Sequence, residues 1–437
     1  MEVFKNLFVN PLVMSHSTIT ILTLLFFLAS SFSQTESTLQ ENFIEAEYYF
    51  VSEDYQDALP YYLRLYENVP DNAYVAYRIG ACYLNIDGKK NLAIEYLEAA
   101  SKNLSAKHKE GTISQVSAPY DALYDLGCAY LINYQFDKAK EAFSRYSGTL
   151  LPDDKDNMEI VKQQIQSCET AKEFIARPVT FTRENMGTTF NDEKSNFNPV
   201  ISADGKTFAY MVSLKFYDAV MLSRLVSGKW SPPVNITPEL MSDGDMYISC
   251  LSSDGKLLFL SRDDDFNSDL YSSSFDGTTW APCKKLNKNI NTKYWESHGY
   301  ISEDGERLVF ASDRPGGYGG LDLYISKRAG GDWGPAVNLG PEINTPLNED
   351  RPFLINNGKT LFFSSQGHRT IGGYDILRSD LQSNNLWSQP ANLGYPLNTP
   401  DDNIFFMPSP NGRSGYYAIF SEAEGSGSYD IYRIAFK

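Results

Sequence analysis

The feature that most constrains this chain is a repeat of about 52 residues that fills residues 178–437. Five tight-turn signals mark the repeat, each an Asp-Gly or Asn-Gly pair between two apolar runs. Such a pair is a strong short-range signal for a β-hairpin. Successive turn glycines lie 50, 50, 53 and 54 residues apart. They are Gly205, Gly255, Gly305, Gly358 and Gly412. The period therefore predicts five equivalent units.

Each unit carries further signals at fixed distances from its turn. Four of the five residues 14 positions before the glycine are asparagine, and an Asp opens a later β-rich run in every unit. The upstream residues are Asn191, Met241, Asn291, Asn344 and Asn398, and the downstream ones are Asp218, Asp269, Asp322, Asp375 and Asp430. Four short strands form one propeller blade, whose apolar faces are buried only when blades stack around an axis. The sequence therefore predicts an all-β five-bladed propeller over residues 178–437.

The phase of the repeat also predicts how the ring closes. The last unit ends without an outer strand, whereas an additional β-rich run, residues 179–185, precedes the first unit. Its Asn185-Met186-Gly187 matches Asn338-Leu339-Gly340 later in the chain. We expect residues 179–185 to form the outer strand of the fifth blade, because pairing both ends of the domain in one sheet removes an open edge.

Residues 40–176 have helical periodicity instead. Small and aromatic residues recur in the same order in three helix–turn–helix copies, and small residues let two helices approach closely. The small residues Ala58, Ala93 and Ala139 lie 35 and 46 residues apart, and a polar insertion near residues 102–119 fills the larger gap. An amphipathic helix over residues 154–175 would cap the stack. The pattern predicts an α-helical solenoid with a capping helix, and a plain helical bundle is the alternative.

The N-terminus has the layout of a secretory signal peptide over residues 1–33. Lys5 precedes an apolar run at residues 19–29, and the small residues Ser31 and Ser33 follow it. An apolar run of 11 residues is shorter than the roughly 20 that a membrane-spanning helix needs. We therefore expect export to the periplasm or the outer membrane, with a retained signal anchor as the alternative.

Charge and cysteine content exclude further classes. The net charge of −17 and the isoelectric point near 4.8 make nucleic acid an unfavourable partner, because an acidic chain repels phosphates. The five cysteines have spacings that fit neither a disulfide framework nor a zinc site. We interpret them as buried small hydrophobic residues. Apolar residues make up 42% of the chain, which is enough to form a core without disulfides or a structural metal.

Two resemblances add to this interpretation. The Ser-x-Asp-Gly-Lys turn at residues 202–206 and the downstream Asp-Leu-Tyr resemble the TolB-type, WD-like propeller repeat, and the helical copies resemble tetratricopeptide (TPR) repeats. Together they resemble Bacteroidetes cell-envelope proteins in which an OmpA-like domain often follows the propeller. The sequence given stops after the fifth unit, so peptidoglycan binding is not carried over. Some relatives serve type IX secretion or gliding, and the shared domains do not decide whether this chain does.

The sequence predicts no catalytic residues, no cofactor and no metal. Asp263, Asp265, Asn267 and Asp269 alternate as in a calcium loop, but the sharp-turning Gly and the bidentate Glu of such a loop are missing. The candidate channel-lining residues are Asn198, His298 and Arg351, seven positions before their turn glycines, with Ile248 and Phe405 as their equivalents.

These observations lead to one expected function and one alternative. The expected function is a non-enzymatic scaffold that binds envelope proteins through the helical groove and the propeller face. The alternative is a propeller that binds or hydrolyses glycans, which would need two carboxylates about 5–9.5 Å apart at the axis.

Overall fold

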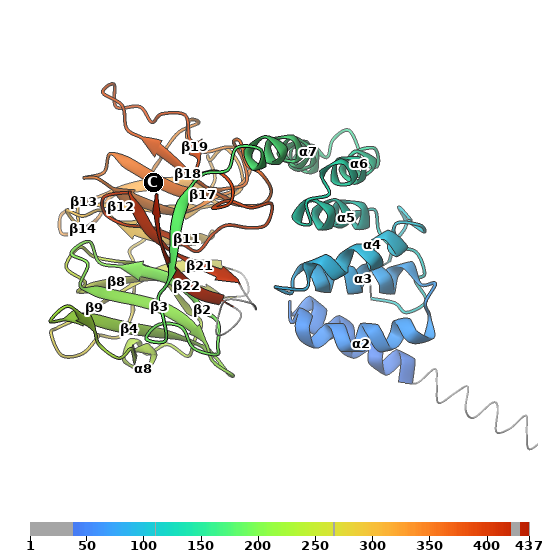
Figure 1. The fold of residues 1–437 in the computed structure, drawn as a ribbon, viewed down its shortest axis with the longest axis horizontal. Coiled ribbons are helices and arrows are strands. Elements are labelled where there is room, and N and C mark those ends of the chain that lie inside the picture. The colour runs from blue at the N-terminus through green and yellow to red at the C-terminus, as the bar shows by residue number, and fades with distance from the viewer. Residues whose placement is uncertain (1–37, 110, 265–266, 421–428, 437) are drawn as a thin grey trace, which may run out of the picture. The chain divides into compact units, whose positions relative to one another are not determined.

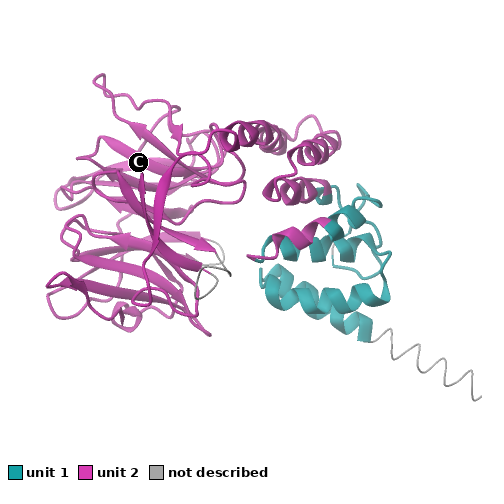
Figure 2. Cartoon of the chain, viewed as in Figure 1, with its two compact units in different colours: residues 1–86, 95–122 teal, residues 87–94, 123–437 magenta. Residues whose placement is uncertain are grey.

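The computed structural model describes residues 38–109, 111–264, 267–420 and 429–436. The described residues form two compact units, one of residues 38–86 and 95–122 and the other of residues 87–94 and 123–436 (Figure 2). The predicted signal peptide, residues 1–33, lies outside the described residues. Among the residues that are described, the helices are too short or too polar to cross a membrane.

The larger unit contains five antiparallel sheets in chain order (Figure 1). The first sheet holds β2 (Asn196–Ile201), β3 (Thr207–Ser213), β4 (Asp218–Val226), β5 (Lys229–Trp230) and β6 (Val234–Asn235). The second holds β7 (Met246–Leu251), β8 (Leu257–Asp264), β9 (Asn267–Ser274) and β10 (Lys284–Lys285). The third holds β11 (Glu296–Ile301), β12 (Arg307–Ser312), β13 (Asp322–Ala329), β14 (Asp332–Trp333) and β15 (Val337–Asn338).

The fourth and fifth sheets complete the ring. The fourth holds β16 (Glu349–Ile355), β17 (Thr360–Ser365), β18 (Asp375–Asp380) and β19 (Ala391–Asn392). The fifth holds β20 (Phe406–Pro408), β21 (Ser414–Phe420), β22 (Tyr429–Phe436) and β1 (Phe181–Asn185). The inner strands β2, β7, β11 and β16 contact one another in that order, and β2 also contacts β20. The predicted five-bladed propeller is therefore confirmed.

Apolar side chains between neighbouring sheets form the core of the propeller. The fourth and fifth blades share a cluster that includes Phe362 and Phe406, whose ring centroids lie 6.0 Å apart. Phe208, Phe259 and Phe310 lie on β3, β8 and β12, the second strands of the first three blades, and each is at most 1% exposed. Burial of such rings drives the stacking of blades.

Strand β1 closes the ring as the sequence predicts. It pairs antiparallel with β22, in the register Phe181 with Phe436 through Asn185 with Tyr432. The pairing continues past the strand, because the Met186 N–H donates to the Ile431 carbonyl at 3.0 Å. One sheet thus contains both the first and the last strand of the domain, which leaves no half-built blade.

In four of the five blades, the recurring asparagine side chain forms hydrogen bonds between the third strand and the segment that follows the outer strand. In the third blade the Leu323 N–H donates to the Asn344 side-chain oxygen at 2.8 Å, and the Asn344 amide donates back to the Leu323 carbonyl at 3.0 Å. Asn191, Asn291 and Asn398 make the same pair of bonds with Ile431, Leu270 and Ile376. The side-chain amide thus pairs with the third strand as a backbone amide of a neighbouring strand would, and it satisfies one N–H and one carbonyl there.

The first blade lacks this asparagine and satisfies the same backbone groups differently. The helical turn α8 (Thr237–Leu240) follows β6, and the Val220 N–H donates to the Thr237 hydroxyl at 2.8 Å. The Val220 carbonyl accepts from the Ile236 N–H at 2.9 Å. Met241, which stands in the asparagine position, ends α8 with a φ of 56°.

The helices pair as hairpins. The smaller unit holds a helix over residues 38–51, α2 (Tyr55–Asn68), α3 (Ala73–Leu84) and most of α4 (Ala93–Ala100). The larger unit holds η1 (Lys90–Leu92), most of α5 (Asp121–Ile132), α6 (Phe136–Ser147) and α7 (Lys155–Ile175).

Close packing explains the recurring small residues. A Cβ at Gly80 would lie 2.4 Å from Leu97 Cγ, and one at Gly127 would lie 2.5 Å from the Phe143 ring. Only glycine permits the helices to approach this closely at these two positions. These contacts show helical hairpins with the predicted close approach, and a TPR solenoid, like the boundaries 40–176 and 178–437, stays a prediction.

The helix α7 packs on α6 and forms hydrogen bonds with the loop between β17 and β18 of the fourth blade. The Gln163 side chain donates to the His368 carbonyl at 3.1 Å and to the Thr370 hydroxyl at 2.9 Å. The Ser167 hydroxyl lies 3.2 Å from the Thr370 hydroxyl, and both residues are fully buried. The larger unit therefore extends the propeller with a helical platform.

All five cysteines are free, and Cys82, Cys168 and Cys250 are buried. Burial raises the pKa of each of these three thiols to about 12, so they are protonated and unreactive at neutral pH. The interpretation as buried small hydrophobic residues is confirmed for these three, whereas Cys128 and Cys283 are half-buried.

Ring closure predicts an asymmetry between neighbouring positions of β1. The Met186 N–H bonds to β22, so in an antiparallel ladder the Glu184 N–H also points at β22 and the Arg183 N–H points away. We expect Glu184→Pro to lower the free energy of unfolding by about 1 kcal/mol more than Arg183→Pro, because only the first removes a ladder hydrogen bond. Chemical denaturation of both variants measures this, and equal losses would contradict the pairing.

Candidate functional site

The three candidate channel-lining residues occupy one strained position of the inner strands. The ladders of β2, β11 and β16 shift register between Phe197 and Val200, between Ser297 and Tyr300, and between Asp350 and Phe353. Asn198, His298 and Arg351 lie within these shifts, with φ angles of 50°, 40° and 49°. A positive φ costs free energy in a residue with a Cβ and persists only where surrounding contacts hold it.

Contacts between blades hold this conformation. The Asn198 amide donates to the Ile248 carbonyl of the second blade at 2.6 Å. The Arg351 Nη1 of the fourth blade donates to the Asn198 side-chain oxygen at 3.3 Å. The Arg351 guanidinium carbon also lies 4.9 Å from the centre of the Phe405 ring in the fifth blade. Arg351 thus contacts the equivalent residues Asn198 and Phe405 in two other blades, and Asn198 bonds to the backbone of the equivalent Ile248 in the second blade.

His298, the fifth equivalent, joins the third blade to the fourth. Its Nδ1 lies 2.9 Å from a carboxylate oxygen of Asp350, and the two side chains are 17% and 13% exposed. The Ser297 hydroxyl donates to the same carboxylate at 3.0 Å. Burial alone would raise the pKa of Asp350, but the interactions with His298 and Arg351 together outweigh burial and lower the pKa. Asp350 was not predicted from the sequence, because its only local signal is its place beside Arg351.

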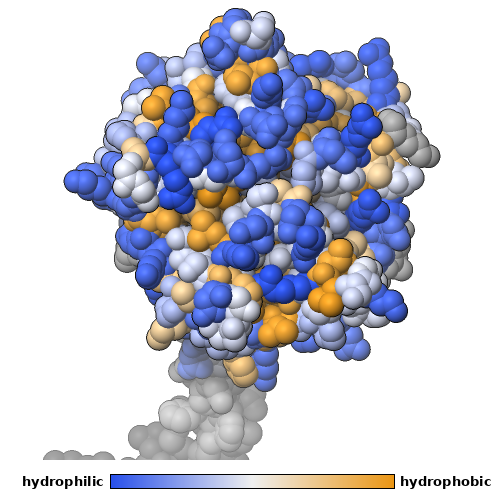
Figure 3. Space-filling view, turned by 90° about the vertical axis from the view of Figure 1, so that its left-hand side faces the viewer, coloured by the Kyte–Doolittle hydropathy of each residue, from blue (hydrophilic) through white to orange (hydrophobic). Residues whose placement is uncertain are grey.

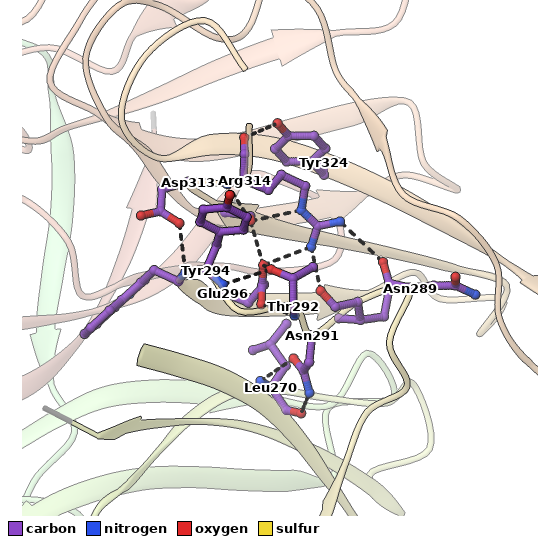
Figure 4. Close-up of polar contacts among 12 residues, drawn as sticks. Leu270, Asn289, Asn291, Thr292, Tyr294, Glu296, Asp313, Arg314 and Tyr324 are labelled. Carbon is purple, nitrogen blue, oxygen red and sulfur yellow. Dashed lines mark hydrogen bonds and ion pairs between the residues drawn. The ribbon is translucent and has the colours of Figure 1, made fainter. Parts of the chain in front are cut away.

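A second set of polar residues lies where the inner strands begin. Glu296 of the third blade is fully buried and accepts from the Thr292 N–H at 2.6 Å and the Ser312 hydroxyl at 2.8 Å. Arg314 forms an ion pair with Glu296 at 3.1 Å and also donates to the carbonyl of Asn289 (Figure 4). The guanidinium supplies the positive charge that a buried carboxylate needs.

Glu349 is the equivalent of Glu296 in the fourth blade, and its surroundings differ in charge. It is fully buried and accepts from the Thr345 N–H at 2.7 Å, the Thr345 hydroxyl at 2.8 Å and the Ser365 hydroxyl at 2.7 Å. Gly367 stands where the third blade has Arg314. Burial raises the pKa of Glu349 to about 8, although its hydrogen bonds act in the opposite direction.

These carboxylates do not form the arrangement that a glycoside hydrolase needs. Such an enzyme uses two carboxyl groups that reach the same sugar. Glu296 and Glu349 are 0% exposed and bond within their own blades, and Asp350 is paired with His298.

Within residues 38–109, 111–264, 267–420 and 429–436, no group of three His, Cys, Asp or Glu residues could hold a metal ion. Asp263 accepts from the Ser268 hydroxyl at 2.5 Å, and Asp269 forms an ion pair with Lys285. Asp265 of the calcium-like sequence lies outside the described residues.

The outer surface of the propeller is mixed in character. Figure 3 views the molecule from the side on which β13 and β14 lie in Figure 1. Hydrophilic side chains predominate on this side, and apolar side chains lie in small groups between them. Such a surface is typical of a protein face that is exposed to water.

Comparison with known proteins gives similar folds and no family. No family model matches the chain, and no curated protein matches it. Among solved structures, TolB from Acinetobacter baumannii is 20% identical with a TM-score of 0.38, and the match covers 55% of each chain. A putative TolB from Agrobacterium tumefaciens is 16% identical with a TM-score of 0.37, over 59% of this chain and 97% of that one.

The solved structures with a similar fold also include an enzyme. The α-L-arabinofuranosidase from Podospora anserina, solved with cellotriose, is 12% identical with a TM-score of 0.35, over 60% of this chain and 95% of that one. The match to TolB from A. baumannii, in contrast, spans only about half the length of that protein. At these identities and TM-scores the comparisons decide neither a family nor an activity, and the five-bladed fold rests on the strand pairing.

The Asp350 ion pair predicts a pH-dependent loss of stability. Because the pKa of Asp350 is lowered by folding, its contribution is present above the ordinary pKa of about 3.9 and is lost as the pH falls through the folded value. We expect Asp350→Asn to lower the free energy of unfolding by about 1–2 kcal/mol at pH 7, with a smaller difference below pH 4. Glu159→Gln, which breaks an exposed pair with Lys162, is the control and should cost less. Equal effects would argue against the pair.

The buried glutamates predict opposite results for one substitution. The folded pKa of Glu349, about 8, exceeds its ordinary value of 4.5, so stability falls as the pH rises through this range. Glu349→Gln should therefore stabilise the chain by on the order of 1 kcal/mol at pH 8 and have little effect at pH 4.5. The fifth blade shows that an amide fits, because Asn403 accepts from the Thr399 N–H at 2.7 Å and donates to its hydroxyl at 3.2 Å.

The matched control for this experiment is Glu296→Gln, which removes the partner of Arg314 and should destabilise at both pH values. Thermal melts at pH 4.5 and pH 8 measure the two variants. A destabilised Glu349→Gln at pH 8 would contradict the assignment of a raised pKa.

Proposed function

We propose that this protein is a non-enzymatic scaffold of the Bacteroidetes cell envelope that binds other envelope proteins. The observation that carries the proposal is the set of contacts across the axis, where Arg351 contacts both Asn198 and Phe405 in two other blades. These contacts join the blades to one another and suit a rigid body that presents its outer surfaces to partners. Repeat architectures of this kind present extended binding surfaces without a reaction centre.

The helical hairpins and the propeller supply two separate binding surfaces in this proposal. The TPR-like region would take one envelope protein in its groove, and the propeller face would take another. Residues 1–33 would direct export to the periplasm, with association at the outer membrane. Membership of a secretion, gliding or outer-membrane assembly complex is the finer form of this proposal. Neither nucleic acid nor peptidoglycan is a proposed partner.

The proposal is tested by affinity purification of the tagged chain from its native envelope, followed by mass spectrometry. We expect one or more envelope proteins to be enriched over an unrelated exported protein with the same tag. The purified chain is also assayed for release of sugar from soluble polysaccharides. Absence of any enriched protein, together with sugar release, would overturn the scaffold and favour the glycan-hydrolysing alternative.

A further inference from the structure

The first helix, residues 38–51, exposes an apolar stripe. Ile44, Tyr48 and Val51 follow one another at helical spacing and are 56%, 66% and 76% exposed. The opposite face of the same helix is ordinary core, since Phe43 is 2% exposed and Ala46 is fully buried. Three large apolar side chains on one exposed helix face are the typical mark of a surface that another molecule covers.

Aromatic rings extend this stripe sideways onto α2. The rings of Tyr48 and Tyr49 lie edge to face with centroids 5.4 Å apart, and Tyr49 stacks on Tyr61 of α2 at 5.9 Å. We call Ile44, Tyr48, Tyr49, Val51 and Tyr61 the N-terminal stripe. Ring-to-ring contacts hold the three tyrosines in place, so these three side chains have little rotamer entropy left to lose when a partner binds.

The position of the stripe makes its composition unusual. A stack of helical hairpins keeps its ends in solution by giving the terminal elements a polar outer face. Residues 38–51 are the first helix of the described chain, yet their exposed face carries the apolar stripe. The packing of this helix on its own unit leaves these three side chains uncovered, so we interpret the stripe as a binding surface.

The charge around the stripe decides what kind of molecule fits. Residues 38–63 contain six acidic residues, and the basic residue beside them is Arg64, whose guanidinium carbon lies 4.8 Å from the centre of the Tyr61 ring. Glu45, Glu53, Asp54 and Asp57 are exposed beside the apolar side chains. A second copy of this chain would bring the same negative charges against these, and a membrane with anionic lipids would repel them as well. An apolar surface with basic residues on its borders complements both the stripe and its flanks.

We propose that the N-terminal stripe binds a basic amphipathic helix of a partner protein. The apolar face of that helix would cover Ile44, Tyr48 and Val51, and its Lys or Arg residues would face Glu45 and Asp57. This inference rests on the proposed scaffold function and deepens it by assigning a surface and a class of partner.

The test measures binding of a labelled helical peptide to the full exported chain by fluorescence anisotropy. The probe is an 18-residue peptide with Leu on one helix face and Lys on the other. We expect Ile44→Ser/Tyr48→Ser/Val51→Ser to raise the Kd at least tenfold. Phe216→Ser/Val226→Ser/Val337→Ser removes three apolar residues of the propeller that are 84%, 62% and 62% exposed, and this matched control should leave the Kd within twofold.

Charge is tested with a second pair of variants. Glu45→Lys/Asp57→Lys should weaken binding and reduce its dependence on salt, whereas Glu184→Lys/Glu306→Lys, at exposed sites of the propeller, should do neither. A peptide with Glu in place of Lys should not bind. Since all substituted side chains are exposed, thermal melts should show every variant folded.

Four results would overturn the proposal. One is equal peptide affinity for the wild-type chain and the Ser variant of the stripe. Another is a dimer in analytical ultracentrifugation that the same variant dissociates, which would make a second copy the occupant. The third is binding to anionic vesicles that this variant abolishes. A native partner that co-purifies equally with wild type and variant would refute the stripe and leave the scaffold function standing.

Discussion

The pairing of β1 with β22 is the interaction on which the rest of the structure depends. It places residues from the two ends of the propeller in one sheet, so that no blade is left with an open edge. Each blade buries its faces only against its two neighbours, and a ring satisfies all five blades at once. Once the ring is closed, the inner strands cannot move apart, and the contacts across the axis are maintained.

Closure of the ring explains the strained residues at the axis. Asn198, His298 and Arg351 would not keep a positive φ in an isolated strand, because nothing there would offset the cost. In the ring, hydrogen bonds to Ile248 and Asn198 and the ion pair with Asp350 hold them. The axis therefore serves as a joint between blades, and binding falls to the outer surfaces of the propeller and the helices.

The sequence predicted the features that local chemistry decides. The turn glycines have φ angles from 64° to 76°, which explains why a period could be counted from Gly205 to Gly412. Closure by residues 179–185 followed from the phase of that period. The asparagines were visible as a pattern, but their bonds were not predicted. These bonds join residues that are distant in the sequence, such as Leu323 in β13 and Asn344 after β15.

Contacts between blades lay beyond what one sequence can show. His298 and Asp350 are 52 residues apart, and only the stacking of the third blade on the fourth brings them together. The same holds for the difference between Glu296 and Glu349, whose local sequences are alike. What separates them is Arg314, which lies 18 residues beyond Glu296 and has no counterpart in the fourth blade.

The most direct test of this account is native-state hydrogen exchange of the backbone amides in β1. If the first strand closes the ring, the ladder amides of Thr182 and Glu184 will exchange as slowly as those of the inner strands and lose protection in the same cooperative step. Exchange of these amides within seconds, while the other four sheets stay protected, would show that the ring is open and that the contacts across the axis have another cause.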